Sequence, residues 1–345
     1  MATPINPTID QAGRQGRPLG DTGRPAQGSV LVVTAKFDPH ADGVIAELKR
    51  RDVPVFRLNT DDFLNEYSVS VEANGDLCIR DRWGRSLDFP AGTRSAWYRK
   101  PVDPAPPAGA DAGAAALVLG ETRAFLDGLA ADPRARWVNH PHMIARARHK
   151  LPQLRLAQSL GLIVPRTLVT NDPDRARAFH ASAGGDLIVK ALRETGYAEG
   201  ADWRSLFTRR LPPAEFAAAA DAIARCPTLL QAYVAKDHEL RVTIIGDAVF
   251  CCRIDSQQVS GAESDWRRAD PAKVPHRMVP LDPAVERALR AMLDQYGLVF
   301  GAFDLIVTAA GDPVFLELNP NGQWLWIERA TGAPLSAAMA DLLAG

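Results

Sequence analysis

The stretch FGAFDLIVTAAGDPVFLELNPNGQWLWIE, residues 300–328, decides the fold class of this chain. It contains two apolar runs, 303–308 and 314–318, which are separated by Gly311-Asp312. Apolar runs of this length on either side of a Gly-Asp turn are typical of two antiparallel strands. The sequence therefore predicts a β-hairpin near the end of the chain.

Three oxygen-bearing side chains lie on this hairpin: Asp304 on its first strand, and Glu317 and Asn319 at the end of its second. Residues two apart on a strand share a face, so Glu317 and Asn319 are expected to point the same way. Hard oxygen donors of this kind suit Mg²⁺ that bridges the phosphates of ATP. The alternative is that Asn319-Pro320-Asn321-Gly322 is only a turn, but a turn does not explain an acid directly after the apolar run. We predict that Asp304, Glu317 and Asn319 bind magnesium.

Outward from the hairpin, helices alternate with mostly antiparallel strands, which indicates two α+β lobes after residue 140. Within this region Asp172 and Pro173 suit the start of a helix, as a cap and a first helical residue. The predicted helices are 144–160, 283–296 and 335–343, and the predicted strands are 166–169, 187–190, 228–234, 240–245 and 248–254.

The N-terminal part has the pattern of an α/β domain. A strand at 30–34, a helix at 41–51 and a strand at 53–58 form a β-α-β start. Asn74-Gly75 is a hairpin signal between two short strands. We predict a disordered tail at 1–28, an N-terminal domain at 29–140, a central lobe at 141–230 and a C-terminal lobe at 231–345.

Composition limits the classes of partner and the compartment. The 345 residues are 46% hydrophobic and 23% charged, and 40 Lys and Arg against 41 Asp and Glu give a net charge of −1. This balance predicts neither a nucleic-acid nor a membrane partner. The tail has no apolar run that would form a signal peptide or a membrane span. The four cysteines include adjacent Cys251 and Cys252 but no CxxC pair, so we expect a reducing cytoplasm rather than a disulfide framework.

Further candidate residues for nucleotide binding lie upstream of the hairpin. Lys150 opens a predicted helix and Lys190 ends a predicted strand, and a lysine is a point charge suited to phosphates, although either residue alone is more often a surface lysine. A strand-to-loop segment suits an adenine ring, with backbone groups at its edge and apolar side chains beside it. This segment consists of Gln231, Ala232, Tyr233 and Val234.

Alternating charged residues follow this segment. Glu239 and Arg241 share a face of the next strand, and Asp237 lies just before it. A salt bridge between Glu239 and Arg241 is the simpler interpretation of that spacing. Further along, Arg267 and Arg268 add positive charge.

Taken in order, these residues resemble the ATP-grasp superfamily. More narrowly, the chain resembles the microviridin-type ATP-grasp peptide maturases, also called graspetide synthetases, over about residues 30–345. The resemblance implies an ATP-grasp fold preceded by a pre-ATP-grasp α/β domain. The motifs that carry it are Trp97-Tyr98-Arg99-Lys100-Pro101, Trp137-Val138-Asn139, Thr170-Asn171, Ser256-Gln257, Asp265-Trp266-Arg267 and the stretch from Phe315 to Glu328 with its Trp324-Leu325-Trp326 signature.

The resemblance implies an enzyme that uses ATP and Mg²⁺ to phosphorylate an Asp or Glu side chain of a ribosomally made precursor peptide. A Thr or Ser hydroxyl, or a Lys amine, then closes an ester or amide ring. Such a precursor has a leader and an acidic, Thr-rich core, and the family also suggests a homodimer. Lys150 and Lys190 would hold phosphates, Gln231 to Val234 would contact adenine, Asp237 or Glu239 would reach the ribose, and Arg241 and Arg267 would stabilise the acyl phosphate.

Two other functions fit parts of the same pattern. One is an ATP-grasp ligase that adds an amino acid or an amine to a protein or small-molecule carboxylate. The other is a nucleotide-binding protein without turnover, which has no need for a set of metal ligands and paired lysines.

The family's glycine-rich phosphate loop has only Gly196 and Gly200 as counterparts here.

Overall fold

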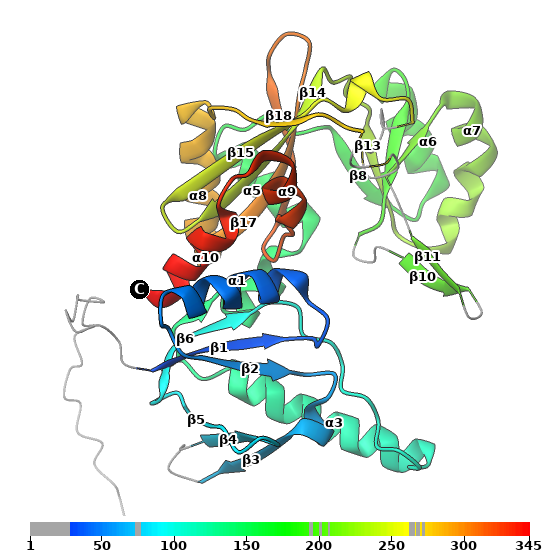
Figure 1. The fold of residues 1–345 in the computed structure, drawn as a ribbon. Helices are drawn as coiled ribbons and strands as arrows, with labels where there is room; N and C mark the ends of the chain where they lie inside the picture. Colours follow the sequence, from blue (N-terminus) through cyan, green and yellow to red (C-terminus); the bar gives the residue numbers. More distant parts are fainter. Residues whose placement is uncertain are drawn as a thin grey trace, which may run out of the picture.

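The computed structural model describes residues 28–72, 77–192, 208–261, 266, 270 and 273–345, together with the backbone at 196–199 and 202–205. The tail predicted at 1–28, apart from Gly28, and the predicted Asn74-Gly75 turn lie outside these residues. The described chain is mixed α/β, as predicted, and Figure 1 shows an N-terminal domain below two lobes. None of its helices combines the length and apolar composition needed to span a membrane.

The N-terminal domain is built on a parallel sheet in the order β2-β1-β6-β7. Figure 1 shows α1 (Pro39–Arg50) and α3 (Ala112–Ala130) on opposite faces of it. Because helices cover both faces, β1 is an almost continuous buried apolar run. Asp38 caps α1 by accepting bonds from the N–H groups of His40 and Ala41. The other elements are β1 (Ser29–Thr34), β2 (Val55–Asn59), α2 (Phe63–Glu66), β6 (Thr93–Tyr98), β7 (Trp137–Val138) and the antiparallel sheet of β3 (Tyr67–Val71), β4 (Leu77–Asp81) and β5 (Ser86–Phe89).

The central lobe is an antiparallel sheet in the order β12-β9-β13-β8, with helices packed on it. The predicted cap is confirmed, because the Asp172 side chain accepts bonds from the first turn of α6 and Pro173 begins that helix. The elements are β8 (Thr167–Thr170), α6 (Pro173–Ala183), β9 (Leu187–Lys190), β10 (Gly196–Glu199), β11 (Asp202–Ser205), β12 (Arg209–Leu211), α7 (Pro213–Ala219), η1 (Ala220–Arg225) and β13 (Thr228–Ala232).

The C-terminal lobe is a sheet in the order β16-β15-β14-β17-β18. One face packs on α8, whose predicted bounds are confirmed. The domain boundary predicted at residue 230 stays a prediction, and β13 runs across it. The elements are β14 (His238–Ile245), β15 (Ala248–Ile254), η2 (Ser256–Gln258), β16 (His276–Met278), α8 (Pro283–Tyr296), β17 (Phe300–Val307), β18 (Pro313–Asn319), α9 (Leu325–Thr331) and α10 (Leu335–Ala344).

The prediction of one continuous helix at 144–160 is wrong, because α4 (Pro141–Ala147) and α5 (Lys150–Ser159) are separate helices. The prediction that Lys150 opens a helix is confirmed, since it is the first residue of α5. The buried Gln153 side chain explains the break. Its amide nitrogen donates to the Ala147 carbonyl at 2.6 Å, so the end of α4 is satisfied from α5. The same side chain donates to the Leu318 carbonyl at 2.8 Å and accepts from the Leu318 N–H, also at 2.8 Å. The break therefore fixes Lys150, the first residue of α5, beside the end of β18.

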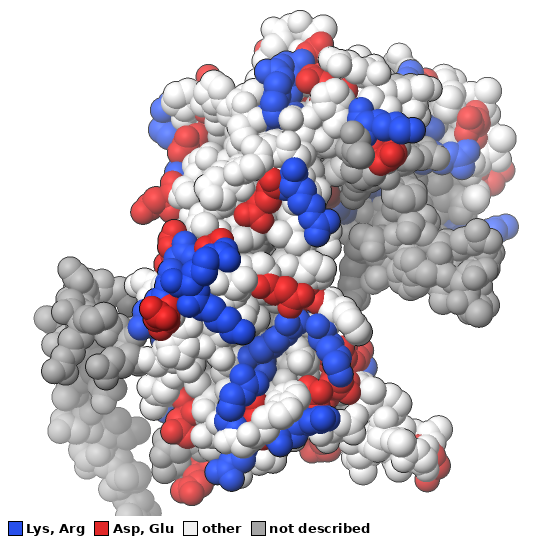
Figure 2. All heavy atoms as spheres, in the orientation of Figure 1, with Lys and Arg blue, Asp and Glu red and all other residues white. Residues whose placement is uncertain are grey.

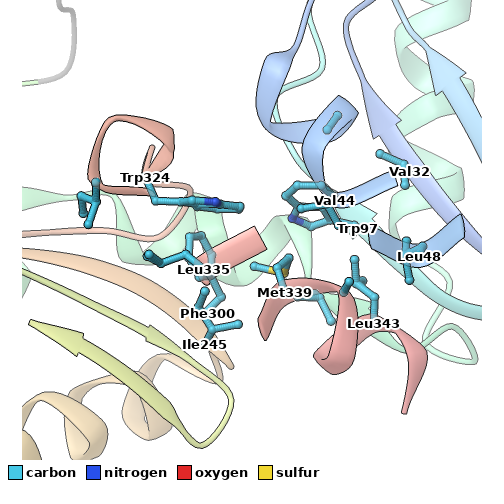
Figure 3. Packing of buried hydrophobic residues seen from close by; sticks show 14 of the residues in the cluster. Val32, Val44, Leu48, Trp97, Ile245, Phe300, Trp324, Leu335, Met339 and Leu343 are labelled. Carbon is cyan, nitrogen blue, oxygen red and sulfur yellow. The ribbon is translucent and has the colours of Figure 1, made fainter. Parts of the chain in front are cut away.

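The N-terminal domain and the C-terminal lobe share one hydrophobic core. Figure 3 shows Val44, Leu48 and Trp97 from the N-terminal domain facing residues of the C-terminal lobe, which include Trp324 and Met339. The indole rings of Trp97 and Trp324 stack with their centroids 6.1 Å apart, and both side chains are fully buried. The two bodies are therefore held in one arrangement by apolar packing.

Trp97→Ala is expected to lower the free energy of unfolding by about 3–5 kcal/mol, because it removes a large buried side chain and leaves a cavity at this joint. Chemical denaturation followed by circular dichroism measures the change. Trp83→Ala is the matched control, since Trp83 is 60% exposed and its loss should cost less than about 0.5 kcal/mol. Equal effects of the two substitutions would contradict the role of Trp97 in joining the domains.

Candidate active site

The predicted metal ligands lie on neighbouring strands at one face of the C-terminal sheet. Asp304 on β17 is the register partner of both Arg241 on β14 and Glu317 on β18. These three side chains therefore form a row across the sheet, and Arg241 donates to Asp304 at 2.6 Å. Val242, next to Arg241, points to the opposite face and packs in the core against α8. The row therefore lies on the face of the sheet opposite to the one that packs on α8.

A β-bulge at Leu316 turns Glu317 toward this row. Asp304 pairs with Glu317, but the next residue of β17, Leu305, pairs with Phe315, so Leu316 is an extra residue in β18. Phe315 is fully buried in the core against α8. Regular alternation would place Glu317 on the same face as Phe315, inside that core. The bulge instead puts the carboxylate on the face of Asp304, a use of bulges that is common beside active sites.

The donor set fits a magnesium ion that is shared with phosphate oxygens. Glu317 forms an ion pair with Lys150, and Asp304 forms one with Arg241, so each carboxylate is matched by a cation. The Asn319 side-chain oxygen accepts a bond from the Asn321 N–H at 3.0 Å. Within the described residues there is no group of three or more His, Cys, Asp or Glu side chains arranged for a metal. Two carboxylates and an amide suit Mg²⁺, which keeps water and substrate phosphates as its other ligands.

The predicted adenine segment lines a pocket between the central and C-terminal lobes. The pocket also contains Lys190, the last residue of β9. The sequence reasoning missed most of the remaining lining. Ile306 had a signal, because it lies two residues from Asp304 on the same strand face. Leu316 follows buried Phe315 and therefore points away from the core that packs on α8. The pocket is lined by Pro165, Ile188, Lys190, Thr208, Gln231, Ala232, Tyr233, Val234, Lys236, Ile306 and Leu316.

Backbone bonds fix the adenine segment against the central lobe. The N–H of Ala232 donates to the Arg166 carbonyl at 2.9 Å, and that of Tyr233 donates to the Asp186 carbonyl at 3.0 Å. The Gln231 side chain is buried and donates to the hydroxyl of Thr167. The pocket wall is therefore held in place by bonds to neighbouring segments of the central lobe.

Solved structures of other proteins resemble this chain over nearly its whole length. No protein-family model matches the chain. A ligase from Chryseobacterium gregarium, described as a RiPP-associated ATP-grasp ligase in complex with ADP and a leader and core peptide, is 26% identical with a TM-score of 0.83, covering 92% of this chain and 96% of that chain. The macrocyclase MdnB from Microcystis aeruginosa MRC is 30% identical with a TM-score of 0.75, covering 92% of this chain and 99% of MdnB. This chain belongs to the ATP-grasp graspetide maturases.

A curated relative of this maturase carries a more general name. The probable alpha-L-glutamate ligase 2 of Shewanella amazonensis is 27% identical over 210 residues. That match covers 58% of the present chain and 64% of the relative's length. The relative and the solved structure from Chryseobacterium gregarium are thus both named ligases, and the solved structure carries the ATP-grasp assignment.

The maturase holds its two candidate ribose contacts differently. Glu239 forms an ion pair with Lys236 at 2.6 Å, and burial raises the pKa of its carboxyl group although Lys236 opposes the shift. Asp237 is largely exposed, and its bond to His238 at 2.7 Å lowers the pKa of its carboxyl group. Of the two, Glu239 is the one paired with a residue of the pocket lining, Lys236.

The remaining predicted residues of the maturase are not part of the described site. Arg267, Arg268 and Gly200 fall outside the described residues. Cys251 and Cys252 are buried and unoxidised, and burial raises the pKa of the Cys252 thiol to about 11, which agrees with a core role.

Proposed function

We propose that this ligase joins side chains of a ribosomally made precursor peptide by activating an Asp or Glu carboxylate with ATP. A carboxylate oxygen attacks the γ-phosphorus of ATP, which gives an acyl phosphate and ADP. A Thr or Ser hydroxyl, or a Lys amine, then attacks the acyl carbon, loses its proton and displaces phosphate. Each ring formed in this way removes one water from the peptide. The observation that carries the proposal is the row of Arg241, Asp304 and Glu317 beside a pocket lined by the adenine segment.

In this proposal the central and C-terminal lobes bind different parts of ATP and its magnesium ion. The pocket takes adenine, and the Val234 N–H is the donor suited to its edge, since those of Ala232 and Tyr233 are already bonded to carbonyls. Glu239 contacts the ribose, and Lys150 and Lys190 hold phosphates. Asp304, Glu317 and Asn319 hold magnesium, which when bound neutralises phosphate charge.

Arg241 faces the transferring phosphoryl group. It is 8% exposed and anchored by Asp304 and by the Gln323 carbonyl, so its charge is fixed before the reaction begins. Preorganised charge of this kind stabilises a transition state more than a mobile side chain does. Positioning and electrostatics therefore provide most of the catalysis, as is usual in phosphoryl transfer.

Mass spectrometry tests the proposal. The full-length enzyme is incubated with ATP, magnesium and an acidic, Thr-rich peptide encoded beside its gene. We expect ADP and a peptide lighter by one water for each ring. A peptide that gains the mass of an amino acid would instead support the second candidate function, which the similarity to probable glutamate ligases favours. ATP binding without ADP release would overturn both.

Lys190→Ala is expected to weaken ATP binding about tenfold and leave peptide binding unchanged, because a lysine at the phosphates acts on one ligand only. Calorimetric titration of each ligand separately measures the two dissociation constants. Lys49→Ala, an exposed lysine on α1, is the control. An unchanged affinity for ATP would return Lys190 to a structural role.

A further inference from the structure

Arg99 is a buried cation whose hydrogen-bonding capacity is only partly used. It follows β6, is 1% exposed, and donates through one terminal nitrogen to the Asn321 carbonyl at 2.8 Å. Its Nε and second terminal nitrogen have no hydrogen-bond partner among the described residues. Nε lies 3.4 Å from a carboxylate oxygen of Asp38, which is an ion-pair distance without hydrogen-bond geometry. Buried donors left without partners are costly. The Arg99 guanidinium therefore keeps a positive charge here that hydrogen bonds only partly satisfy.

Arg99 and Asn321 fasten the end of β6 to the loop that follows the metal-binding strand. Arg99 donates to the carbonyl of Asn321, and the Asn321 side-chain amide donates back to the carbonyl of Arg99. The loop begins at Asn319, the last residue of β18, whose side chain accepts from the Asn321 N–H. This reciprocal bonding brings Lys100, the residue after Arg99, to the active-site loop although it belongs to the N-terminal domain.

The loop also contacts Arg241, the arginine assigned to the phosphoryl group. A Cβ atom on Gly322 would lie 3.1 Å from a terminal nitrogen of Arg241, so the guanidinium packs directly against this glycine. The carbonyl of Gly322 accepts a bond from Arg99 at 3.3 Å. Arg241 directs one terminal nitrogen to Asp304 and the other to the Gln323 carbonyl. The guanidinium therefore faces the metal ligands on one side and the loop fastened to β6 on the other.

Positive charge at this place exceeds negative charge. Lys100 is exposed to solvent and forms no hydrogen bond or ion pair with any described residue. Although the residue as a whole is exposed, desolvation of its amine, together with the charges of Arg99 and Arg241, lowers the pKa of that amine to about 8. Asp38 opposes this shift, but its carboxylate is also bonded to Thr34 and to the first turn of α1. On the face drawn in Figure 2, by contrast, basic and acidic side chains mostly lie close to one another.

The position of Lys100 in the N-terminal sheet also favours a ligand. β1 pairs in parallel with β2 on one side and with β6 on the other, so the strand order reverses between β1 and β6. Open α/β sheets bind ligands at the carboxyl ends of strands beside such a reversal. Lys100 follows the carboxyl end of β6, and Asp38 follows that of β1.

We propose that Lys100 binds the side-chain carboxylate of the peptide that the enzyme is about to phosphorylate, holding it between the N-terminal domain and Arg241. This inference rests on the proposed function and adds to it a residue that selects the acidic side chain. ATP phosphates are assigned to the opposite side of Arg241, toward Asp304 and Lys150. Lys100 therefore acts on the peptide rather than on the nucleotide.

A pair of peptides matched in shape but different in charge tests this assignment. The probes are a synthetic peptide with an acidic, Thr-rich core and a version with Gln and Asn in place of its core Glu and Asp. Calorimetry with the full-length enzyme saturated with magnesium and ADP measures their dissociation constants. Lys100→Ala is expected to weaken binding of the acidic peptide roughly tenfold to a hundredfold and that of the amide version less than about twofold, because only a carboxylate forms a charge-assisted bond.

Two further variants make the outcome specific. Lys100→Arg keeps the charge and is expected to restore most of the binding. Lys36→Ala removes a lysine of the same sheet edge that pairs with Asp62, and should leave both affinities unchanged. Equal loss for both peptides, no loss for either, or a weaker affinity for ATP would overturn the assignment. Loss of water from the peptide with the wild-type enzyme reports on the proposed function separately, so failure of one is distinguishable from failure of the other.

Discussion

Glu317→Gln is expected to reduce turnover by about a thousandfold or more while the protein stays folded. The substitution removes one of two carboxylates from the proposed magnesium site and keeps the shape of the side chain. Two carboxylates, Asp304 and Glu317, face each other across β17 and β18, and Mg²⁺ depends on such charged oxygen ligands to hold phosphates. ADP release and loss of water from the peptide, measured over a range of magnesium concentrations, give the change in rate.

Two other substitutions accompany this experiment. Asn319→Ala should reduce turnover in the same direction, because it removes the third oxygen ligand. Glu286→Gln is the control, since Glu286 lies on α8 and bonds to Arg290 within the same helix. Circular dichroism confirms that each variant is folded. A wild-type rate for Glu317→Gln would show that Glu317 is not a magnesium ligand.

Arg241→Ala is expected to lower the turnover rate by about a hundredfold to a thousandfold, because a buried, preorganised charge is lost from the transition state. Single-turnover measurements with saturating ATP and peptide isolate the chemical step. The loss should appear in this step more than in the affinity for ATP. A change confined to ATP affinity would instead assign Arg241 to ground-state binding.

The pairing of Arg241 with Asp304 requires a control for stability. Removing the arginine leaves Asp304 without its cation, so thermal unfolding of Arg241→Ala must be measured beside activity. Arg241→Lys keeps the charge but loses the two-sided contact with Asp304 and the Gln323 carbonyl, and an intermediate rate is expected. Arg290→Ala should leave turnover unchanged, because Arg290 lies on α8 and bonds to Glu286 and to the carbonyls of Gly246 and Asp247.

Local signals explain the parts of the fold that the sequence predicted well. The amphipathic pattern of 283–296 predicts α8 with its observed bounds, and the structure shows that Asp282 caps its start and Gly297 ends it in a left-handed conformation. The hairpin of β17 and β18 was predicted because its turn and its two apolar runs are contiguous in the chain. A helix or hairpin whose signals lie within a short stretch of neighbouring residues can be predicted without knowing which other elements pack against it.

The helix predicted at 144–160 shows where such reading fails. Apolar residues continue at helical spacing through the segment, so periodicity alone gives one helix. Gln153 separates α4 from α5 by bonding both to Ala147 and to Leu318, which is 165 residues away. No local pattern contains that contact.

For this protein, the sequence by itself determined the residue types of the candidate site and their order along the chain. It also determined the hairpin that brings Asp304 and Glu317 together. Only the tertiary structure decided that the bulge at Leu316 turns Glu317 away from the core and that Arg99 carries Lys100 from another domain to the loop after β18. The physical reason is that strand register and domain contacts depend on which surfaces pack together, and these are energies between residues far apart in the chain.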